Sequence, residues 1–223
     1  MHRLIFLILL LLITFPAYSD SNEMSKEEID LLKQKVSLAE QGDVNAQFEL
    51  ALIYTNGDDA PQDYQAAIKW YTLAANQGHA NAQGNLGRLY AKGKGTPQDY
   101  KTAIKWYTLA ANQGHANAQS NLGHLHANGE GTPQDYKTAI KWYTRAANQE
   151  YARAQSSLGK MYEYGRGVTQ DNVYAHMWFN IAASNGSKYG KKMRDLVVDN
   201  MSLTQIEKAQ ELAREWIAKH STN

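Results

Sequence analysis

An internal repeat of 36 residues constrains the fold of this chain more than any other feature of its sequence. Four blocks of this length follow one another without a gap, and the second and third are nearly identical. They cover residues 43–78, 79–114, 115–150 and 151–186. A block this short cannot bury an apolar face by itself, so neighbouring blocks must stack and share a core. The period therefore predicts a solenoid.

Each block carries the patterns of two helices. In the second block, apolar residues recur three or four positions apart from Ala82 to Tyr90, which is the stripe of an amphipathic helix. Gly93 is suited to the left-handed conformation that ends a helix. Asp99 is suited to cap the free N–H groups of a second helix, which ends at Gly114. The chain is therefore predicted to be all-α, with four helix pairs.

One tryptophan occupies an equivalent position in the second helix of every block. A residue that recurs once per structural unit indicates packing between helices, and each ring can bury roughly 150–250 Å². The alternative is that these rings stack on a bound ligand. The four residues are Trp70, Trp106, Trp142 and Trp178.

The first 19 residues have the pattern of a secretory signal peptide. Arg3 precedes a long aliphatic run, and the small residues at Ala17 and Ser19 predict cleavage between Ser19 and Asp20. An uncleaved anchor is the alternative, although the run is shorter than the ~20 residues of a membrane span. We therefore expect a periplasmic or secreted protein with no membrane span after cleavage.

The remaining ends of the chain have the patterns expected of caps. Terminal repeats of a solenoid must cover an apolar face that has no neighbour. Residues 20–42 predict one amino-terminal capping helix, in which Ser25 and Glu28 form a capping box. Residues 187–223 predict a carboxyl-terminal capping helix pair.

Composition excludes several kinds of site. The sequence has no cysteine, which excludes disulfides, thiolate metal sites, a cysteine nucleophile and a lipid at the cleavage site. Removal of the signal takes Arg3 from the 23 basic residues and leaves 22, equal to the 22 acidic residues. A neutral chain argues against nucleic acid or anionic lipid as the main partner, because both select a basic face.

The repeat resembles the Sel-1-like repeat family, a relative of the tetratricopeptide repeats. The family pattern is A-x-x-x-L-G-x-x-Y, then G-x-G-x-x-x-D-Y-x-x-A, then W-Y-x-x-A-A-x-x-G. The second block supplies it with Ala82, Leu86, Gly87, Tyr90, Gly93, Gly95, Asp99, Tyr100, Ala103, Trp106, Tyr107, Ala110, Ala111 and Gly114. Departures elsewhere are Asp59, His126, Glu150 and Thr169. The resemblance covers residues 43–186 and implies a right-handed α-α superhelix that serves as an interaction platform without shared chemistry.

By analogy with related solenoids, the first helix of each pair lines the concave surface. Its outward positions are the predicted partner-binding residues, because they vary from block to block on a fixed frame. Unselected drift at solvent positions would give the same variation. The residues are Phe48, Leu52, Asn56, Arg88, Lys92, Asn117, His124, Asn128, Lys160 and Tyr164. This mixture of apolar and positively charged side chains favours an extended peptide with acidic residues.

Two short motifs could indicate catalysis or metal binding, but both are weak signals. Ser157 and Lys160 fit the S-x-x-K element of penicillin-recognising enzymes, but the S-D-N and K-T-G elements that accompany it are missing. His124 and His126 lie two apart on a helix and point to different sides, so they cannot chelate one metal ion. We predict no catalytic residue, no metal site and no cofactor.

The leading hypothesis is a non-catalytic adaptor that holds a protein or peptide in its concave face. One alternative is binding of cell-wall glycan, in which tryptophan and tyrosine would stack on sugar rings. A second is a β-lactam hydrolase that uses Ser157. The sequence names neither the partner nor the oligomeric state.

Overall fold

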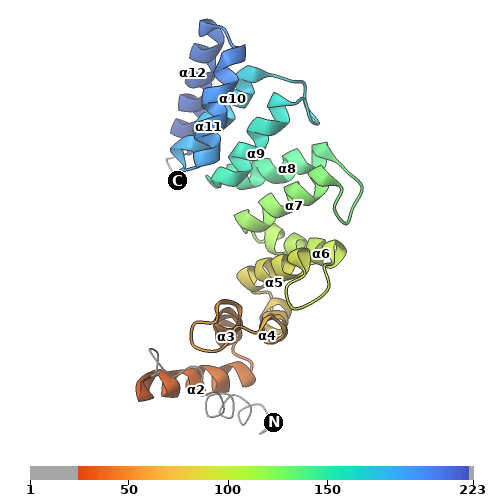
Figure 1. The fold of residues 1–223 in the computed structure, drawn as a ribbon, viewed down its shortest axis with the longest axis vertical. Helices are drawn as coiled ribbons and strands as arrows, with labels where there is room; N and C mark the ends of the chain where they lie inside the picture. The colour runs from red at the N-terminus through yellow and green to blue at the C-terminus, as the bar shows by residue number, and fades with distance from the viewer. Residues whose placement is uncertain (1–24, 221–223) are drawn as a thin grey trace.

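The computed structural model describes residues 25–220, and all regular elements in this range are helices (Figure 1). The predicted signal peptide lies outside the described residues. In chain order the elements are α2 (Lys26–Glu40), α3 (Val44–Asn56), α4 (Tyr64–Asn76), α5 (Ala80–Lys92), α6 (Tyr100–Asn112), α7 (Ala116–Asn128), α8 (Tyr136–Ala147), α9 (Ala152–Glu163), α10 (Asn172–Ser184), α11 (Lys188–Val197), the short 3-10 helix η2 (Val198–Asn200) and α12 (Leu203–His220). Over these residues, no helix combines the length and apolarity that crossing a membrane requires.

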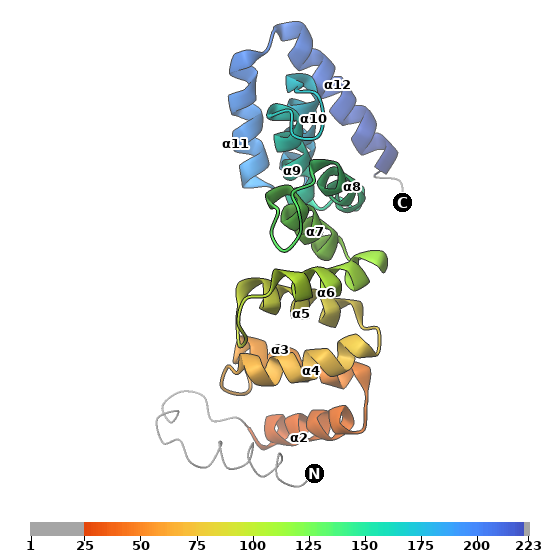
Figure 2. The same ribbon diagram turned by 90° about the vertical axis from the view of Figure 1, so that its right-hand side faces the viewer.

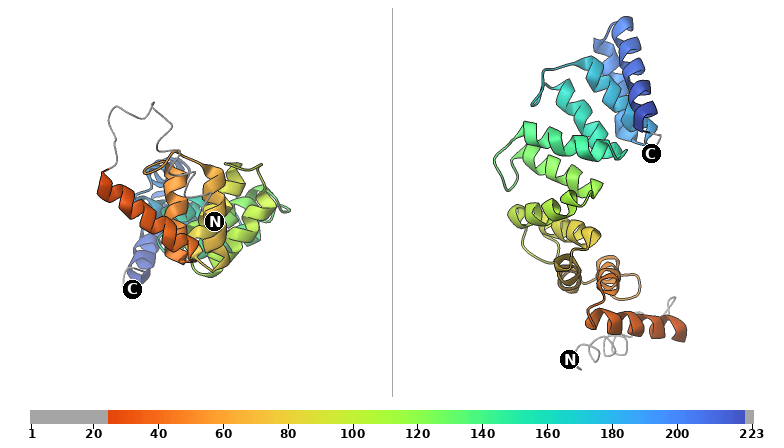
Figure 3. Two further views of the ribbon diagram at one scale, coloured as in Figure 1. Left: turned by 90° about the horizontal axis from the view of Figure 1, so that it is seen from below. Right: turned by 180° about the vertical axis from the view of Figure 1, so that it is seen from behind.

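The four repeats form helical hairpins that stack into an arc. The hairpins are α3–α4, α5–α6, α7–α8 and α9–α10, and each packs on the next through its second helix. The first helices lie on the inner side of the arc and the second helices on the outer side, as Figure 1 and the view from behind in Figure 3 show. The prediction of an all-α solenoid is confirmed.

Helix ends follow the residues that the pattern singles out. Asp99 accepts a hydrogen bond from the backbone of Thr102 at 3.0 Å, which caps α6. Gly93 ends α5 with φ 62°. Glu150 adopts φ 59° at the position where other repeats have glycine, and among described residues it alone has positive φ without being glycine. The left-handed conformation that follows the second helix of the other repeats is thus kept at this junction, although Glu150 carries a side chain.

Close packing inside each hairpin depends on a small residue in the first helix. A Cβ placed on Gly123 would lie 2.6 Å from the ring of Tyr143, and one on Gly159 would lie 2.5 Å from the ring of Phe179. These rings are buried, with 3% of Tyr143 and none of Phe179 exposed. Glycine therefore lets the aromatic ring of the second helix lie directly on the backbone of the first.

A buried glutamine links each hairpin to the one before it. The Nε2 of Gln119 donates to the carbonyl of Ala111 at 3.0 Å, and its Oε1 accepts from Nε2 of Gln149 at 2.8 Å. The same pair of bonds recurs at the other junctions. The equivalent glutamines are Gln47, Gln83 and Gln155. Each of these four glutamines has an exposed fraction of 4% or less. Their hydrogen bonds therefore join neighbouring hairpins at sites that water does not reach.

The caps cover the two ends differently. Ser25 and Glu28 form the predicted capping box, and α2 packs on α3 as a second helix without a first. The carboxyl-terminal helices α11 and α12 both pack on α10 but hardly on each other. Figure 2 shows them as two arms that diverge from a common apex.

Candidate functional site

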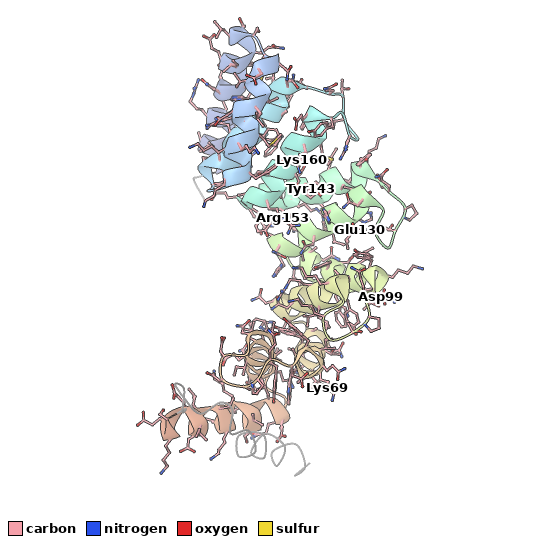
Figure 4. All side chains as sticks on the ribbon, viewed as in Figure 1. Lys69, Asp99, Glu130, Tyr143, Arg153 and Lys160 are labelled. Carbon is pink, nitrogen blue, oxygen red and sulfur yellow. The ribbon has the colours of Figure 1, made fainter. Side chains whose placement is uncertain are left out.

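The inner face of the arc is a stripe of four positions on each first helix. In α3 these are residues 45, 49, 52 and 56, which share one side of the helix because they are three or four apart. We call this set the inner face. It comprises Asn45, Glu49, Leu52, Asn56, Asn81, Asn85, Arg88, Lys92, Asn117, Asn121, His124, Asn128, Arg153, Ser157, Lys160 and Tyr164. In Figure 4, Arg153 lies on the open side of the arc, whereas Asp99 and Lys69 lie on the opposite side.

All predicted partner-binding residues except Phe48 belong to the inner face. The ring of Phe48 stacks on His79, with 4.4 Å between centroids, at the junction of the first and second repeats. The equivalent Gly84 faces the ring of His115. The structure thus places Phe48 at a contact between hairpins, where its half-buried ring packs on the core.

The inner-face residues of the first repeat include one apolar side chain, Leu52, and no cationic one. Leu52 is half-buried against the core of the first repeat. Asn56 donates to Asp58 at 3.1 Å, and Glu49 forms an ion pair with Lys35 of α2 at 3.0 Å. The charge of Glu49 is therefore balanced by Lys35.

Arg88 lies among tyrosines of the second helices. Its charge acts on Tyr71 and Tyr107, and burial raises the pKa of Tyr107 to about 12. The hydroxyl of Tyr71 bonds to Asn85 at 3.2 Å. Tyrosines that sit in the core of the hairpins therefore present hydroxyl groups to the inner face. Lys92, the other predicted residue of this repeat, is exposed.

In the third repeat, the inner face carries a chain of amides. Asn117 donates to the hydroxyl of Tyr151 at 2.7 Å and accepts from Asn121 at 2.8 Å. Asn121 in turn accepts from Arg153 at 3.4 Å. These bonds fix the amides and leave the guanidinium of Arg153 largely exposed.

The other predicted residues of the third repeat lie at the far end of α7. Asn128 contacts Nε2 of His124 at 3.1 Å and donates to Glu130 at 3.2 Å. His124 and Asn128 are both exposed.

The fourth repeat ends the inner face with cationic and aromatic groups. The Nζ of Lys160 lies 4.6 Å from the ring centroid of Tyr189 on α11. Tyr164 is 55% exposed, and the guanidinium of Arg166 lies 5.2 Å from its ring centroid. Exposed tyrosines beside cations are typical of protein-binding surfaces.

Ser157 and Lys160 do not form a nucleophile and base. The hydroxyl of Ser157 donates to the carbonyl of Arg153 at 3.0 Å. Lys160 is directed to Tyr189 instead. Between residues 25 and 220, no group of three or more histidine and acidic side chains is placed to hold a metal ion.

The repeated tryptophans lie mainly inside the solenoid. Trp70 and Trp178 are each 8% exposed, and Trp106 and Trp142 are half-buried. The ring of Trp142 is also covered by Arg145, whose Cζ lies 4.7 Å from its centroid. These positions pack helices together, as the recurrence of one tryptophan in every repeat predicts.

Part of the inner face was not among the predicted residues. The prediction selected positions that differ between repeats, whereas Asn45 and Asn81 occupy a position that is asparagine in the first three repeats. Helical spacing from the predicted residues, applied in every repeat, identifies the asparagines and Arg153.

Comparisons with known proteins agree with this geometry. The Sel1 repeat model matches residues 44–79, 80–115, 116–151 and 152–187, one residue later than the predicted blocks. A protective antigen of uropathogenic Escherichia coli with an SLR fold is 35% identical, with a TM-score of 0.81 over 86% of this chain. The chain spans only 41% of that protein.

A Sel1 repeat protein from Oxalobacter formigenes is 31% identical, with a TM-score of 0.72, over 87% of this chain and 79% of its own. The comparison with curated proteins found no match. Sel1 repeat proteins are generally protein-interaction scaffolds and are typically non-catalytic. With four matched repeats that cover most of its length, the chain belongs to the Sel1 repeat family.

Proposed function

We propose that this chain is an exported, non-catalytic scaffold that holds an extended, acidic segment of a partner protein on its inner face. The observation that carries the proposal is the charge of that face. Four of its residues are cationic, namely Arg88, Lys92, Arg153 and Lys160, and its one acidic residue, Glu49, is already paired with Lys35. A face of one sign attracts and orients a segment of the opposite sign.

The amides of the inner face support an extended conformation of the bound segment. Asn45 and Asn81 are exposed, and an asparagine side chain can donate to a peptide carbonyl and accept from a peptide N–H. Hairpins stack about 10 Å apart, and an extended chain advances about 3.3 Å per residue. Acidic residues about six positions apart would therefore meet cations of the second and fourth repeats together.

Export is the second part of the proposal. It is supported by the basic start, the aliphatic run and the small residues before Asp20. Fractionation of the native cell and amino-terminal sequencing test it. We expect a mature chain that begins at Asp20 in the periplasm or medium; a cytoplasmic chain that retains its first 19 residues would contradict export.

The binding face is tested by photo-crosslinking in the native cell. A photo-reactive amino acid replaces Asn81, which is exposed on the inner face, or Lys69, which is exposed on the outer side (Figure 4). We expect a specific crosslinked partner from position 81 and none from position 69. Equal crosslinking from both positions would contradict the proposal.

Charge-reversal variants distinguish specific binding at the inner face from nonspecific binding. The double variant Arg88→Glu with Lys92→Glu should abolish the crosslink at position 81, because the partner's carboxylates are then repelled. The matched control is Lys101→Glu with Lys105→Glu, two exposed positions on α6, which should leave it unchanged. Circular dichroism verifies that both variants remain helical.

A further inference from the structure

A pocket lies between the two carboxyl-terminal helices and α10, on a different part of the molecule from the inner face. Its volume is about 490 Å³, within the range of small-molecule sites. We call it the wedge pocket, because its lining residues come from α11 and α12 as well as α10. Figure 2 shows that α11 and α12 diverge. The pocket is lined by His176, Asn180, Arg194, Asp195, Val198, Ile206, Gln210 and Arg214.

The wedge pocket arises where the sequence departs from the repeat. Each repeat has a buried leucine followed by alanine or glycine in its first helix, as at Leu158 and Gly159, and this pair lets the second helix pack closely. The equivalent residues of α11 are Arg194 and Asp195. Two charged side chains cannot be buried in an apolar hairpin seam without partners, so α12 is held away from α11.

The charges in the pocket are not balanced. Arg194 is used internally, because its Nε and Nη2 donate to Oδ1 of Asp195 at 2.9 and 2.7 Å and its Nη1 donates to Asn180 at 3.2 Å. Within the range 25–220, the side chains of Arg214 and Gln210, both on α12, make no hydrogen bond or ion pair. Glu211, beside Arg214 in space, is already paired with Lys208 at 2.8 Å. The guanidinium of Arg214 therefore lines the pocket without a hydrogen bond or ion pair, although its charge also acts on Glu211.

The floor of the pocket is neutral and polar. His176 is 3% exposed, and its Nδ1 has no hydrogen-bond partner among the described residues. Burial, followed by the charge of Arg194, lowers the pKa of His176, so the ring is uncharged at pH 7. Val198 and Ile206 at the apex add an apolar wall.

We propose that the wedge pocket binds a small carboxylate, with Arg214 as the residue that pairs with the ligand. One unpaired guanidinium matches a single negative charge, and its planar donors match the two oxygens of a carboxylate. The amides of Asn180 and Gln210 are placed to bond to polar groups of the ligand, and the apex accommodates a short aliphatic side chain. The carboxylate belongs either to a free organic acid or to the carboxyl terminus of a peptide.

The test is a titration of the ¹⁵N-labelled mature chain, followed by NMR. The probes are N-acetylvaline and a short peptide that ends in valine, each compared with its carboxamide, which removes the charge and preserves the shape. We expect both acids to shift amide signals of α10, α11 and α12, and the carboxamides to leave these signals in place. If the peptide binds more tightly than N-acetylvaline, the pocket takes a peptide terminus; the reverse order indicates a free acid.

Variants decide whether Arg214 is responsible. Arg214→Gln should weaken binding of the acids by about tenfold or more, because a charge-assisted pair is lost at an exposed position that does not support the fold. Lys219→Gln, which removes an exposed cation from the same helix outside the pocket, should not change it. Absence of shifts in these helices, equal binding of acid and carboxamide, or unchanged binding by Arg214→Gln would each overturn the proposal.

Discussion

The buried glutamine at each junction gives a quantitative test of how the hairpins are held together. Replacement of Gln119 by methionine keeps the volume and removes the bonds to Ala111 and Gln149. The carbonyl of Ala111 keeps a second bond, from Gly114 N at 3.1 Å, and Gln149 is exposed and can bond to water instead. We therefore expect a loss of about 1–2 kcal/mol in the free energy of unfolding, close to one net buried hydrogen bond.

The matched control is Gln65→Met, the same substitution at an exposed position of α4. Its cost should stay under about 0.5 kcal/mol, as for most exposed substitutions. Urea unfolding followed by both tryptophan fluorescence and circular dichroism measures the two values, and coincident transitions justify a two-state treatment. The reasoning is refuted if Gln119→Met costs no more than Gln65→Met.

Three further predictions use other features of the repeats. Glu150→Gly should raise the free energy of unfolding by about 1 kcal/mol, because glycine adopts φ 59° without the Cβ penalty; a decrease in urea melts would contradict this. Gly159→Ala should lower it by about 1–3 kcal/mol, because the new Cβ meets the ring of Phe179; thermal melts equal to those of the parent chain would show that the hairpin adjusts freely. His79 and His115 cap helices through neutral Nδ1 atoms, and burial lowers the pKa of each. The two histidines therefore bind protons more strongly in the unfolded chain than in the folded chain. The free energy of unfolding should fall as the pH drops from about 6.5, the unfolded pKa, through the lower pKa values of the folded chain. The asparagine double variant at these two positions should reduce that slope in urea melts across pH 5–8, and an unchanged slope would contradict the assignment.

The solenoid could be predicted from the sequence because every local signal agreed with the repeat. Asp99 and Gly93 mark helix ends, and equal spacing places them identically in each block. The glutamine links were not predicted, since a polar residue such as Gln119 in an apolar stripe gives no sign of which carbonyl it reaches across a junction. Which carbonyl each glutamine reaches is determined by how neighbouring hairpins stack.

The candidate site could be predicted only in outline. Helical spacing placed Arg88 and Lys160 on the inner face, but it assigned Phe48 to the same surface. A one-position difference on a helix turns a side chain by about 100°, which is enough to move Phe48 from the open face to the contact with His79. The wedge pocket could not be predicted, because the capping pattern of residues 187–223 indicates two helices but not the angle between them.

Deletion of residues 80–115, one complete Sel1 repeat, tests most directly whether the chain is a stack of equivalent hairpins. The deletion joins His79 to Ala116 and so recreates the His-Ala step found at both original junctions. Small-angle scattering should show a helical rod shorter by about 10 Å, the spacing of one hairpin layer. An aggregated or unfolded product, or a rod of unchanged length, would contradict the account.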